Sequence, residues 1–164
     1  MSTWNDHERW AAMCSRDGCP ICCRQEPLEV IAAVEASWVT MQEFAPVPGY
    51  VCLVSRTHAV ELHDLAQDVA AAFMRDAQRV SRALSAATGA VKLNYEIHGN
   101  SLPHLHMHFF PRYRGDPFEG KPIDPKSVLG PVYAEGEFQR IRDAFLFPWT
   151  SPARSDSASL RKDP

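Results

Sequence analysis

Three histidines alternate with apolar residues near the middle of the sequence. His104, His106 and His108 are separated by Leu105 and Met107. Successive side chains of a β-strand point to opposite faces, so a strand here would place the three imidazoles on one face and the apolar residues on the other. A helix would scatter the same histidines around its axis. The alternation therefore predicts a strand with one chemical face and one core face.

Three neighbouring imidazoles are costly to hold together for packing alone, because each is polar and repels its like when charged. Two kinds of chemistry fit them. One is metal coordination, since imidazole is the commonest metal ligand, and the other is nucleophilic catalysis by one histidine that its neighbours support. A single catalytic metal bound by all three is harder to build, because same-face neighbours on a strand are about 6.5–7 Å apart and two converge more easily than three.

A pair of cysteines near the start of the chain is a second candidate site. Cys19 and Cys22 flank a Pro-Ile dipeptide in a turn-rich segment, so their sulfurs can lie on one side and share a tetrahedral Zn²⁺. The same spacing also serves thiol exchange, or no function. A zinc reading needs two more ligands, and His58 and His104 can reach the turn if the strands beside them are antiparallel neighbours.

The elements that must position these residues can be read from the apolar periodicity. Alternating segments predict strands at 28–34, 37–44, 50–54, 90–97 and through the histidines, and spacings of three, four and seven predict helices at 62–87 and 135–147. The fold class is therefore α+β, a five-stranded antiparallel sheet with one long helix packed on it and a C-terminal helix. We expect an N-terminal extension (1–16), one domain (17–150) and a disordered tail (151–164).

Composition and charge limit the kinds of partner that the protein can be expected to bind. The net charge of −3 over 164 residues gives no basic field for duplex nucleic acid, although a local phosphate pocket stays possible. No apolar run approaches the roughly 18 residues that span a bilayer, and the polar N-terminus does not look like an export signal, so we expect a cytoplasmic protein with no membrane partner. An odd number of cysteines argues against a disulfide framework. They are Cys14, Cys19, Cys22, Cys23 and Cys52.

The sequence resembles the histidine triad (HIT) family, in its bacterial zinc-containing branch of nucleotide hydrolases and transferases. Residues 104–110 fit the pattern His-φ-His-φ-His-φ-φ, where φ is apolar, without a mismatch. The Cys-x-x-Cys pair, a Ser-Arg-Thr-His segment at 55–58, the long helix and a strand containing Asn94 follow in the order seen in the family. The resemblance covers about residues 17–113, and it implies the HIT-like fold.

The resemblance also implies an activity. His106 would attack the α-phosphorus of a purine nucleotide or dinucleotide and form a nucleotidyl-histidine intermediate, while His108 would hydrogen-bond the phosphate or the leaving group. The implied substrates are nucleoside phosphoramidates, nucleoside phosphosulfates and dinucleoside polyphosphates, with no catalytic Mg²⁺. The residues that match the family's substrate contacts are Gln42, Asn94, Asn100 and Ser101, although Asn and Ser also favour turns.

The family's other features complete the prediction. Relatives with a Cys-x-x-Cys use residues matching Cys19, Cys22, His58 and His104 as ligands of a structural Zn²⁺, and the smaller members form homodimers. The sequence leaves open whether Cys14 or Cys23 replaces a neighbour as ligand. The alternative to an enzyme is a non-catalytic zinc-containing module that binds nucleotides.

Overall fold

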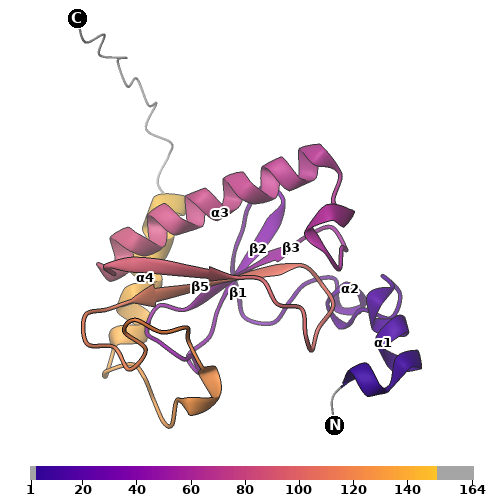
Figure 1. Cartoon of the computed structure of the whole chain (residues 1–164). Helices are drawn as coiled ribbons and strands as arrows, with labels where there is room; N and C mark the ends of the chain where they lie inside the picture. The colour runs from indigo at the N-terminus through magenta and orange to yellow at the C-terminus, as the bar shows by residue number, and fades with distance from the viewer. Residues whose placement is uncertain (1–2, 151–164) are drawn as a thin grey trace, which may run out of the picture.

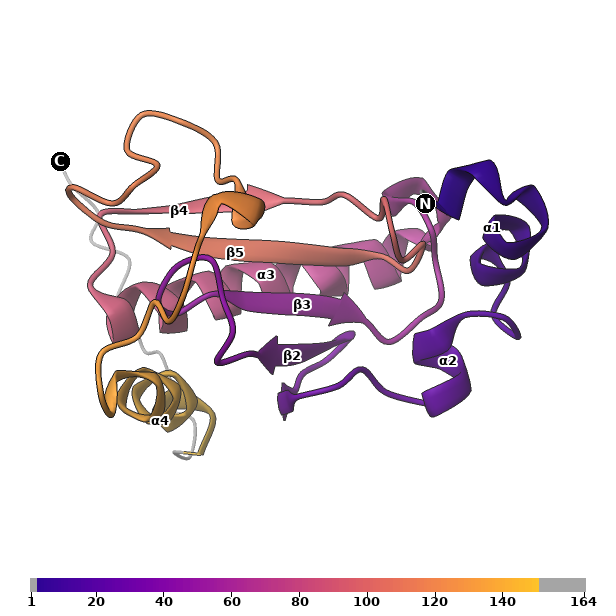
Figure 2. The ribbon, with the colours of Figure 1, turned by 90° about the horizontal axis from the view of Figure 1, so that it is seen from below.

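Five antiparallel strands form one sheet, as predicted, and their order in the sheet is β1-β2-β3-β5-β4. The structure, a computed structural model, describes residues 3–150. Figure 1 shows the sheet nearly edge-on, and Figure 2 shows it turned so that its strands lie side by side. The strands are β1 Val30–Ala33, β2 Ser37–Met41, β3 Val51–Ser55, β4 Lys92–Glu96 and β5 His106–Arg112.

The strand that carries the histidines begins later than the sequence pattern predicts. β5 starts at His106, so His104 precedes the strand instead of opening it. The backbone N–H of Leu105 donates to Ala59, and the Leu105 carbonyl accepts from Ser55, so the lead-in is tied to the segment after β3. His104 therefore lies apart from the other two histidines and close to the residues around His58.

One face of the sheet is covered by helices. The long helix α3 (Gln67–Thr88) begins five residues later than predicted, because residues 62–64 form a separate 3-10 turn, and it ends at Gly89 in the left-handed conformation with φ 65°. α4 (Glu137–Thr150) contacts α3 and joins the same core. The largest fully buried side chains in this core include Phe73, Leu84, Phe109 and Phe145.

The opposite face, which we call the second face, is covered only at its two ends. It carries Tyr50, Cys52, His106, His108 and Phe110, which alternate with the core residues of β3 and β5. At one end the short helix α2 (Pro20–Arg24), preceded by α1 (His7–Cys14), packs Ile21 on Cys52 and Val54.

At the other end of the second face lies the irregular chain that follows β5. Phe118 and Ile123 of this segment pack on Val47 and Phe110. Figures 1 and 2 show the segment lying against the sheet on the side away from α3. His106 and His108 lie along β5 between the two covered ends, so the middle of the second face is where a ligand can reach them.

Two further predictions concern the C-terminal tail and membrane-spanning helices. The disordered tail predicted for 151–164 lies outside the described residues. Within residues 3–150, no helix combines the length and the apolar character that a bilayer crossing requires.

Candidate active site and metal centre

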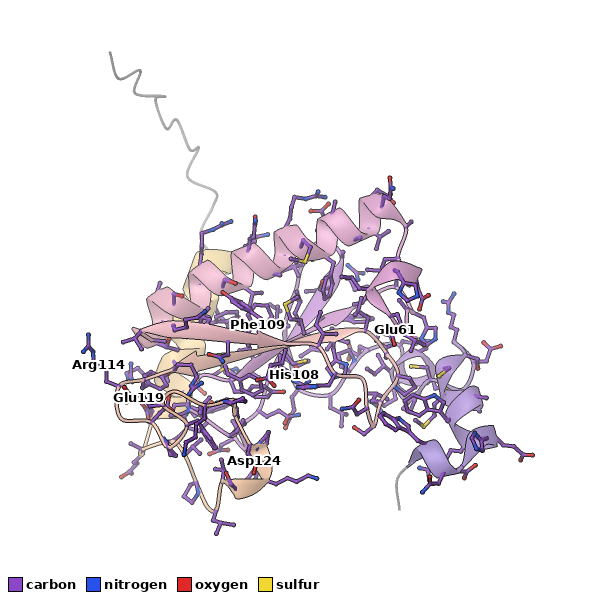
Figure 3. The ribbon with its side chains drawn as sticks, in the orientation of Figure 1. Glu61, His108, Phe109, Arg114, Glu119 and Asp124 are labelled. Atoms are coloured by element: carbon purple, nitrogen blue, oxygen red, sulfur yellow. The ribbon has the colours of Figure 1, made fainter. Side chains whose placement is uncertain are left out.

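The strand β5 sorts its residues by face. Met107 and Phe109 enter the core under α3, whereas His106 and His108 are partly exposed on the second face. Figure 3 shows His108 below the sheet, on the side opposite α3. The predicted alternation is correct from His106 onward, and it places two imidazole rings edge to face with centroids 4.7 Å apart.

The ring of His106 is held by a hydrogen bond to the backbone two residues earlier. Its Nδ1 atom lies 2.6 Å from the carbonyl oxygen of His104, so Nδ1 carries a proton and donates it. In the neutral imidazole the lone pair is then on Nε2. The strand thus fixes the tautomer that a nucleophilic histidine needs.

His108 has a different partner. Its Nδ1 atom lies 2.7 Å from Oη of Tyr50, and its ring stacks on Phe110 with centroids 5.8 Å apart. Burial, with a smaller contribution from the nearby His106 and His98, lowers the pKa of His108 to about 4. At neutral pH this imidazole is therefore uncharged.

A cavity of about 460 Å³ opens beside His108. Its walls are mostly aromatic and apolar, with a few polar groups, which suits a flat ring with polar edges. Gln42, one of the predicted substrate contacts, lines this cavity. The lining residues are Gln42, Phe44, Pro46, Tyr50, Glu96, His98, His108, Phe110, Pro122, Ile123 and Pro125.

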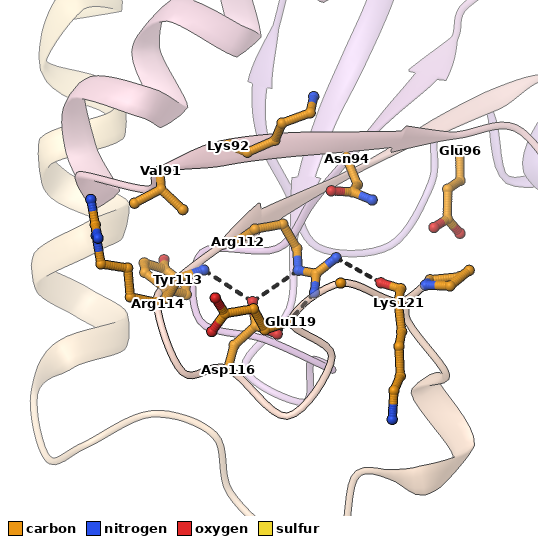
Figure 4. A pocket seen from close by; sticks show the side chains of 12 residues that line it. Val91, Lys92, Asn94, Glu96, Arg112, Tyr113, Arg114, Asp116, Glu119 and Lys121 are labelled. Atoms are coloured by element: carbon orange, nitrogen blue, oxygen red, sulfur yellow. Dashed lines mark hydrogen bonds and ion pairs between the residues drawn. The ribbon is translucent and has the colours of Figure 1, made fainter.

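A second cavity, of about 600 Å³, contains Asn94 and is shown in Figure 4. It shares Glu96 and Pro122 with the first cavity. Arg112, which is 8% exposed, forms a two-pronged ion pair with Asp116, with both N···O distances 2.9 Å. This ion pair lowers the pKa of Asp116 to about 2.

The four predicted metal ligands come together at the other end of the second face. Cys19, Cys22, His58 and His104 each offer one atom, and these atoms lie within 4.8 Å of one another. Both histidines offer Nδ1. Their separations are 3.3 Å from Cys19 to His104, 3.4 Å from Cys22 to His58, 3.8 Å from Cys22 to His104, and 3.4 Å between the two imidazoles.

These distances fit a tetrahedral zinc site. Zn–S bonds of about 2.3 Å and Zn–N bonds of about 2.0–2.1 Å place the ligand atoms of a tetrahedron roughly 3.3–3.8 Å apart. The outer nitrogens of the histidines are also held: Nε2 of His58 donates to the Cys14 carbonyl at 2.9 Å, and Nε2 of His104 donates to the Ser55 carbonyl at 2.8 Å. Both Nδ1 lone pairs therefore face the thiols, as they must to bind a metal.

The remaining cysteines lie outside this group. The thiol of Cys23 contacts the Asp17 carbonyl at 3.1 Å, and Cys14 contributes its backbone carbonyl to His58. Burial raises the pKa of Cys22 to about 11, with the neighbouring Cys19 adding to the shift. A metal ion would therefore have to displace a firmly held proton.

The structure separates the predicted substrate residues. Asn100 and Ser101 are exposed in the chain between β4 and β5, and they line neither of the two cavities. Tyr50, Glu96 and His98 also line the cavity at His108, although none of them was predicted from the sequence. Glu96 had a usable signal, because it is two residues from Asn94 on the same strand face. Tyr50 had none, since its partner is 58 residues away.

Comparison with known proteins agrees with the family resemblance seen in the sequence. The sequence model of the HIT domain matches residues 24–115. A histidine triad protein from Bradyrhizobium japonicum is 34% identical, with 71% of this chain and 86% of that chain covered and a TM-score of 0.62. One from Marinobacter aquaeolei is 26% identical, with 73% and 85% covered and a TM-score of 0.62.

A Zn-bound histidine triad family protein from Mycobacterium smegmatis shares the fold at 21% identity, with 82% of this chain and 97% of that chain covered and a TM-score of 0.60. The search of curated proteins gave no match. The match to the family model and the 34% identical neighbour, together with the HIT-like fold, establish that this chain belongs to the histidine triad (HIT) family.

Proposed function

We propose that this protein is a nucleotide hydrolase or nucleotidyl transferase that works through a covalent intermediate on His106. Membership of the HIT family supports a nucleotide hydrolase or transferase in general terms. The observation that carries the finer proposal is the 2.6 Å contact from Nδ1 of His106 to the His104 carbonyl, because it leaves the Nε2 lone pair as the nucleophile.

The first step forms a bond from Nε2 of His106 to the α-phosphorus and breaks the bond from phosphorus to the leaving group. The leaving group departs with the electron pair of that bond. The imidazole ring, now bonded through Nε2, keeps its Nδ1 proton and shares it with the His104 carbonyl, which stabilises the positive ring. Water or another acceptor then displaces the imidazole from phosphorus and releases its own proton to solvent.

His108 acts in this proposal as a hydrogen-bond donor. Because its pKa is lowered to about 4, the ring is neutral and is a poor source of a whole proton at pH 7. A neutral imidazole can still donate Nε2–H to an oxygen of the phosphate or leaving group as negative charge develops there. A donor placed in this way is worth about 2–4 kcal/mol of barrier lowering.

The cavity at His108 supports a purine nucleotide or dinucleotide as substrate. A planar base would lie against the aromatic and apolar side chains that line this cavity, which include Phe44, Phe110 and Ile123. Gln42 at this cavity and Asn94 in the adjoining one are the proposed polar substrate contacts. Asn100 and Ser101 remain predicted phosphate contacts, and they would have to approach the substrate from the exposed lead-in.

We also propose that Cys19, Cys22, His58 and His104 hold a structural Zn²⁺. A bound zinc ion would tie the start of α2 to the segment after β3 and to the segment before β5. It would thereby support the His104 backbone carbonyl to which His106 donates. The catalytic step proposed above uses no Mg²⁺. The proposed assembly is a homodimer, supported by β4 at the edge of the sheet.

Trapping the intermediate tests the function. The protein is incubated briefly with an adenylyl phosphoramidate, denatured, and measured by mass spectrometry. We expect an added adenylyl mass that is absent from His106→Ala, together with a fall in turnover of at least about 10³-fold. The His63→Ala variant is the control, because the His63 side chain is exposed and lines neither of the two cavities.

Two outcomes would contradict the assignment. Turnover that survives in His106→Ala excludes this histidine as nucleophile. Tight binding of nucleotides with no turnover of phosphoramidates, phosphosulfates or dinucleoside polyphosphates would favour the non-catalytic binding module instead.

A further inference from the structure

Tyr50 is the hydrogen-bond partner of the His108 ring. It immediately precedes β3 and belongs to the second face of the sheet, where its Oη lies 2.7 Å from Nδ1 of His108. The two rings are tilted by only 20°, with centroids 5.9 Å apart, and Tyr50 also stacks on Phe110 at 5.0 Å. Packing on both rings therefore fixes where the phenol oxygen lies.

The chemistry of the two groups decides which one donates. Burial raises the pKa of Tyr50, so the phenol keeps its hydrogen. Burial also keeps His108 neutral, as its lowered pKa indicates. A neutral imidazole has one N–H and one lone pair, and a phenol O–H is a stronger acid than an imidazole N–H. The short contact is therefore best formed by O–H of Tyr50 donating to the lone pair on Nδ1.

The other groups around His108 leave this arrangement in place. On its own strand His106 lies edge to face, and His98, from the chain after β4, has its ring centroid 5.7 Å away. Nε2 of His98 is 2.8 Å from the Glu96 carboxylate. Glu96 on β4 and Cys52 on β3 are the strand partners of His108, and burial raises the pKa of Cys52 to about 12, so that this thiol is neutral.

We propose that Tyr50 is a positioning residue for the reaction, which holds His108 in the tautomer with its proton on Nε2. This inference rests on the proposed function, in which that N–H is donated to the phosphate or leaving group. If Nδ1 held the proton, Nε2 would present a lone pair to an anionic substrate, which would repel it. The tyrosine thus converts a neutral histidine into a donor of fixed direction.

The tautomer can be measured without any substrate. Long-range ¹H–¹⁵N correlation spectra at pH 7.5 distinguish a protonated ring nitrogen from an unprotonated one, and His108→Gln assigns the signals. We expect His108 of the unmodified protein to carry its proton on Nε2, and Tyr50→Phe to give a mixture of both tautomers. A proton found on Nδ1 of His108 in the unmodified protein would overturn the proposal, whether or not the variant folds.

Kinetics gives the second measurement. Tyr50→Phe keeps the stacked ring and removes only the hydroxyl, so we expect kcat for an adenylyl phosphoramidate to fall about ten- to hundredfold while KM changes less than about threefold. Tyr95→Phe is the control, since it also removes a phenol hydroxyl, from a side chain that packs on Phe109 at the opposite face of the sheet and lines neither cavity. An unchanged kcat in Tyr50→Phe would contradict the role.

The two proposals fail in different ways. If His106→Ala keeps full turnover, the covalent mechanism is wrong, but the tautomer of His108 can still be read from the spectra. If His106→Ala is inactive and Tyr50→Phe has the activity of Tyr95→Phe, the mechanism stands and the role of Tyr50 is excluded.

Discussion

Each histidine of the triad is defined by what holds one of its two ring nitrogens. Nε2 of His104 donates to the Ser55 carbonyl, which turns Nδ1 toward the cysteines. Nδ1 of His106 donates to a carbonyl, which leaves the Nε2 lone pair. Nδ1 of His108 contacts Tyr50. Three identical side chains, two residues apart, thus acquire three different chemical characters from their neighbours.

The first prediction concerns the metal ligands one residue at a time. Cys22 and Cys23 are adjacent in the chain, but only Cys22 belongs to the four-residue group, while the Cys23 thiol contacts the Asp17 carbonyl. We expect Cys22→Ser to lose most of its zinc and to lower Tm by roughly 5–15 °C, because metal binding contributes to folding. Cys23→Ser should keep about one zinc per chain.

Zinc content measured by atomic emission and Tm measured by calorimetry, each before and after treatment with a chelator, check this expectation. Zinc lost from Cys23→Ser and kept in Cys22→Ser would assign the ligand to Cys23. An equal zinc content in both variants would contradict the prediction that Cys22, and not Cys23, is a zinc ligand.

The residue types of this site could be predicted from the sequence, but their contacts could not. The alternation at 104–108 and the Cys-x-x-Cys spacing are local patterns, and so His106, Cys19 and Cys22 could be selected directly. For His104 and His108 the choice of ring nitrogen depends on groups of distant segments, the Ser55 carbonyl and the Tyr50 phenol. No spacing in the sequence encodes such a contact.

At the scale of elements, periodicity predicted the sheet and the long helix well, because both bury one regular face. It predicted nothing for the segment after β5. That segment is held by Arg112, whose guanidinium donates to the Asp116 carboxylate and to the Lys121 carbonyl (Figure 4). It also donates to the Phe118 carbonyl. A single buried arginine that bonds irregular backbone leaves no periodic pattern in the sequence. It nevertheless holds the segment whose Pro122 and Ile123 line the cavity at His108.

The second prediction is that this segment loses stability in acid. The pKa of Asp116 is lowered to about 2 in the folded protein, below its unfolded value near 3.9. Its contribution to the free energy of unfolding is therefore fully present above about pH 4 and is lost as the pH falls toward 2. We expect Asp116→Asn to be destabilised by about 2 kcal/mol at pH 7, with the difference from the unmodified protein shrinking below pH 4.

Urea unfolding at pH 7, 4 and 3 measures this difference. Asp124→Asn is the matched control, because Asp124 is exposed in the same segment and caps the turn Pro125–Ser127, where asparagine is an equally good cap. A loss for Asp116→Asn that is the same at pH 3 as at pH 7 would mean that its ion pair with Arg112 is not the cause.

At the scale of the whole molecule, the two faces of the sheet have different tasks. α3 and α4 cover one face and form the main core, whereas the second face is covered at its ends and leaves His106 and His108 accessible between them. The β4 edge of the sheet is a third surface. Val91, Tyr95 and Ile97 along it are 60%, 50% and 43% exposed, which is costly for apolar side chains beside an unpaired strand.

The last prediction is that this edge joins two copies of the chain. Pairing of β4 with its counterpart across a two-fold axis would satisfy its free backbone groups and cover the three apolar side chains. Sedimentation equilibrium should then give twice the 18.4 kDa of one chain. Ile97→Glu would bury a carboxylate in the contact and should weaken association roughly 100-fold. Leu28→Glu, an exposed leucine outside β4, should leave it unchanged, and a dimer that resists Ile97→Glu would place the contact elsewhere.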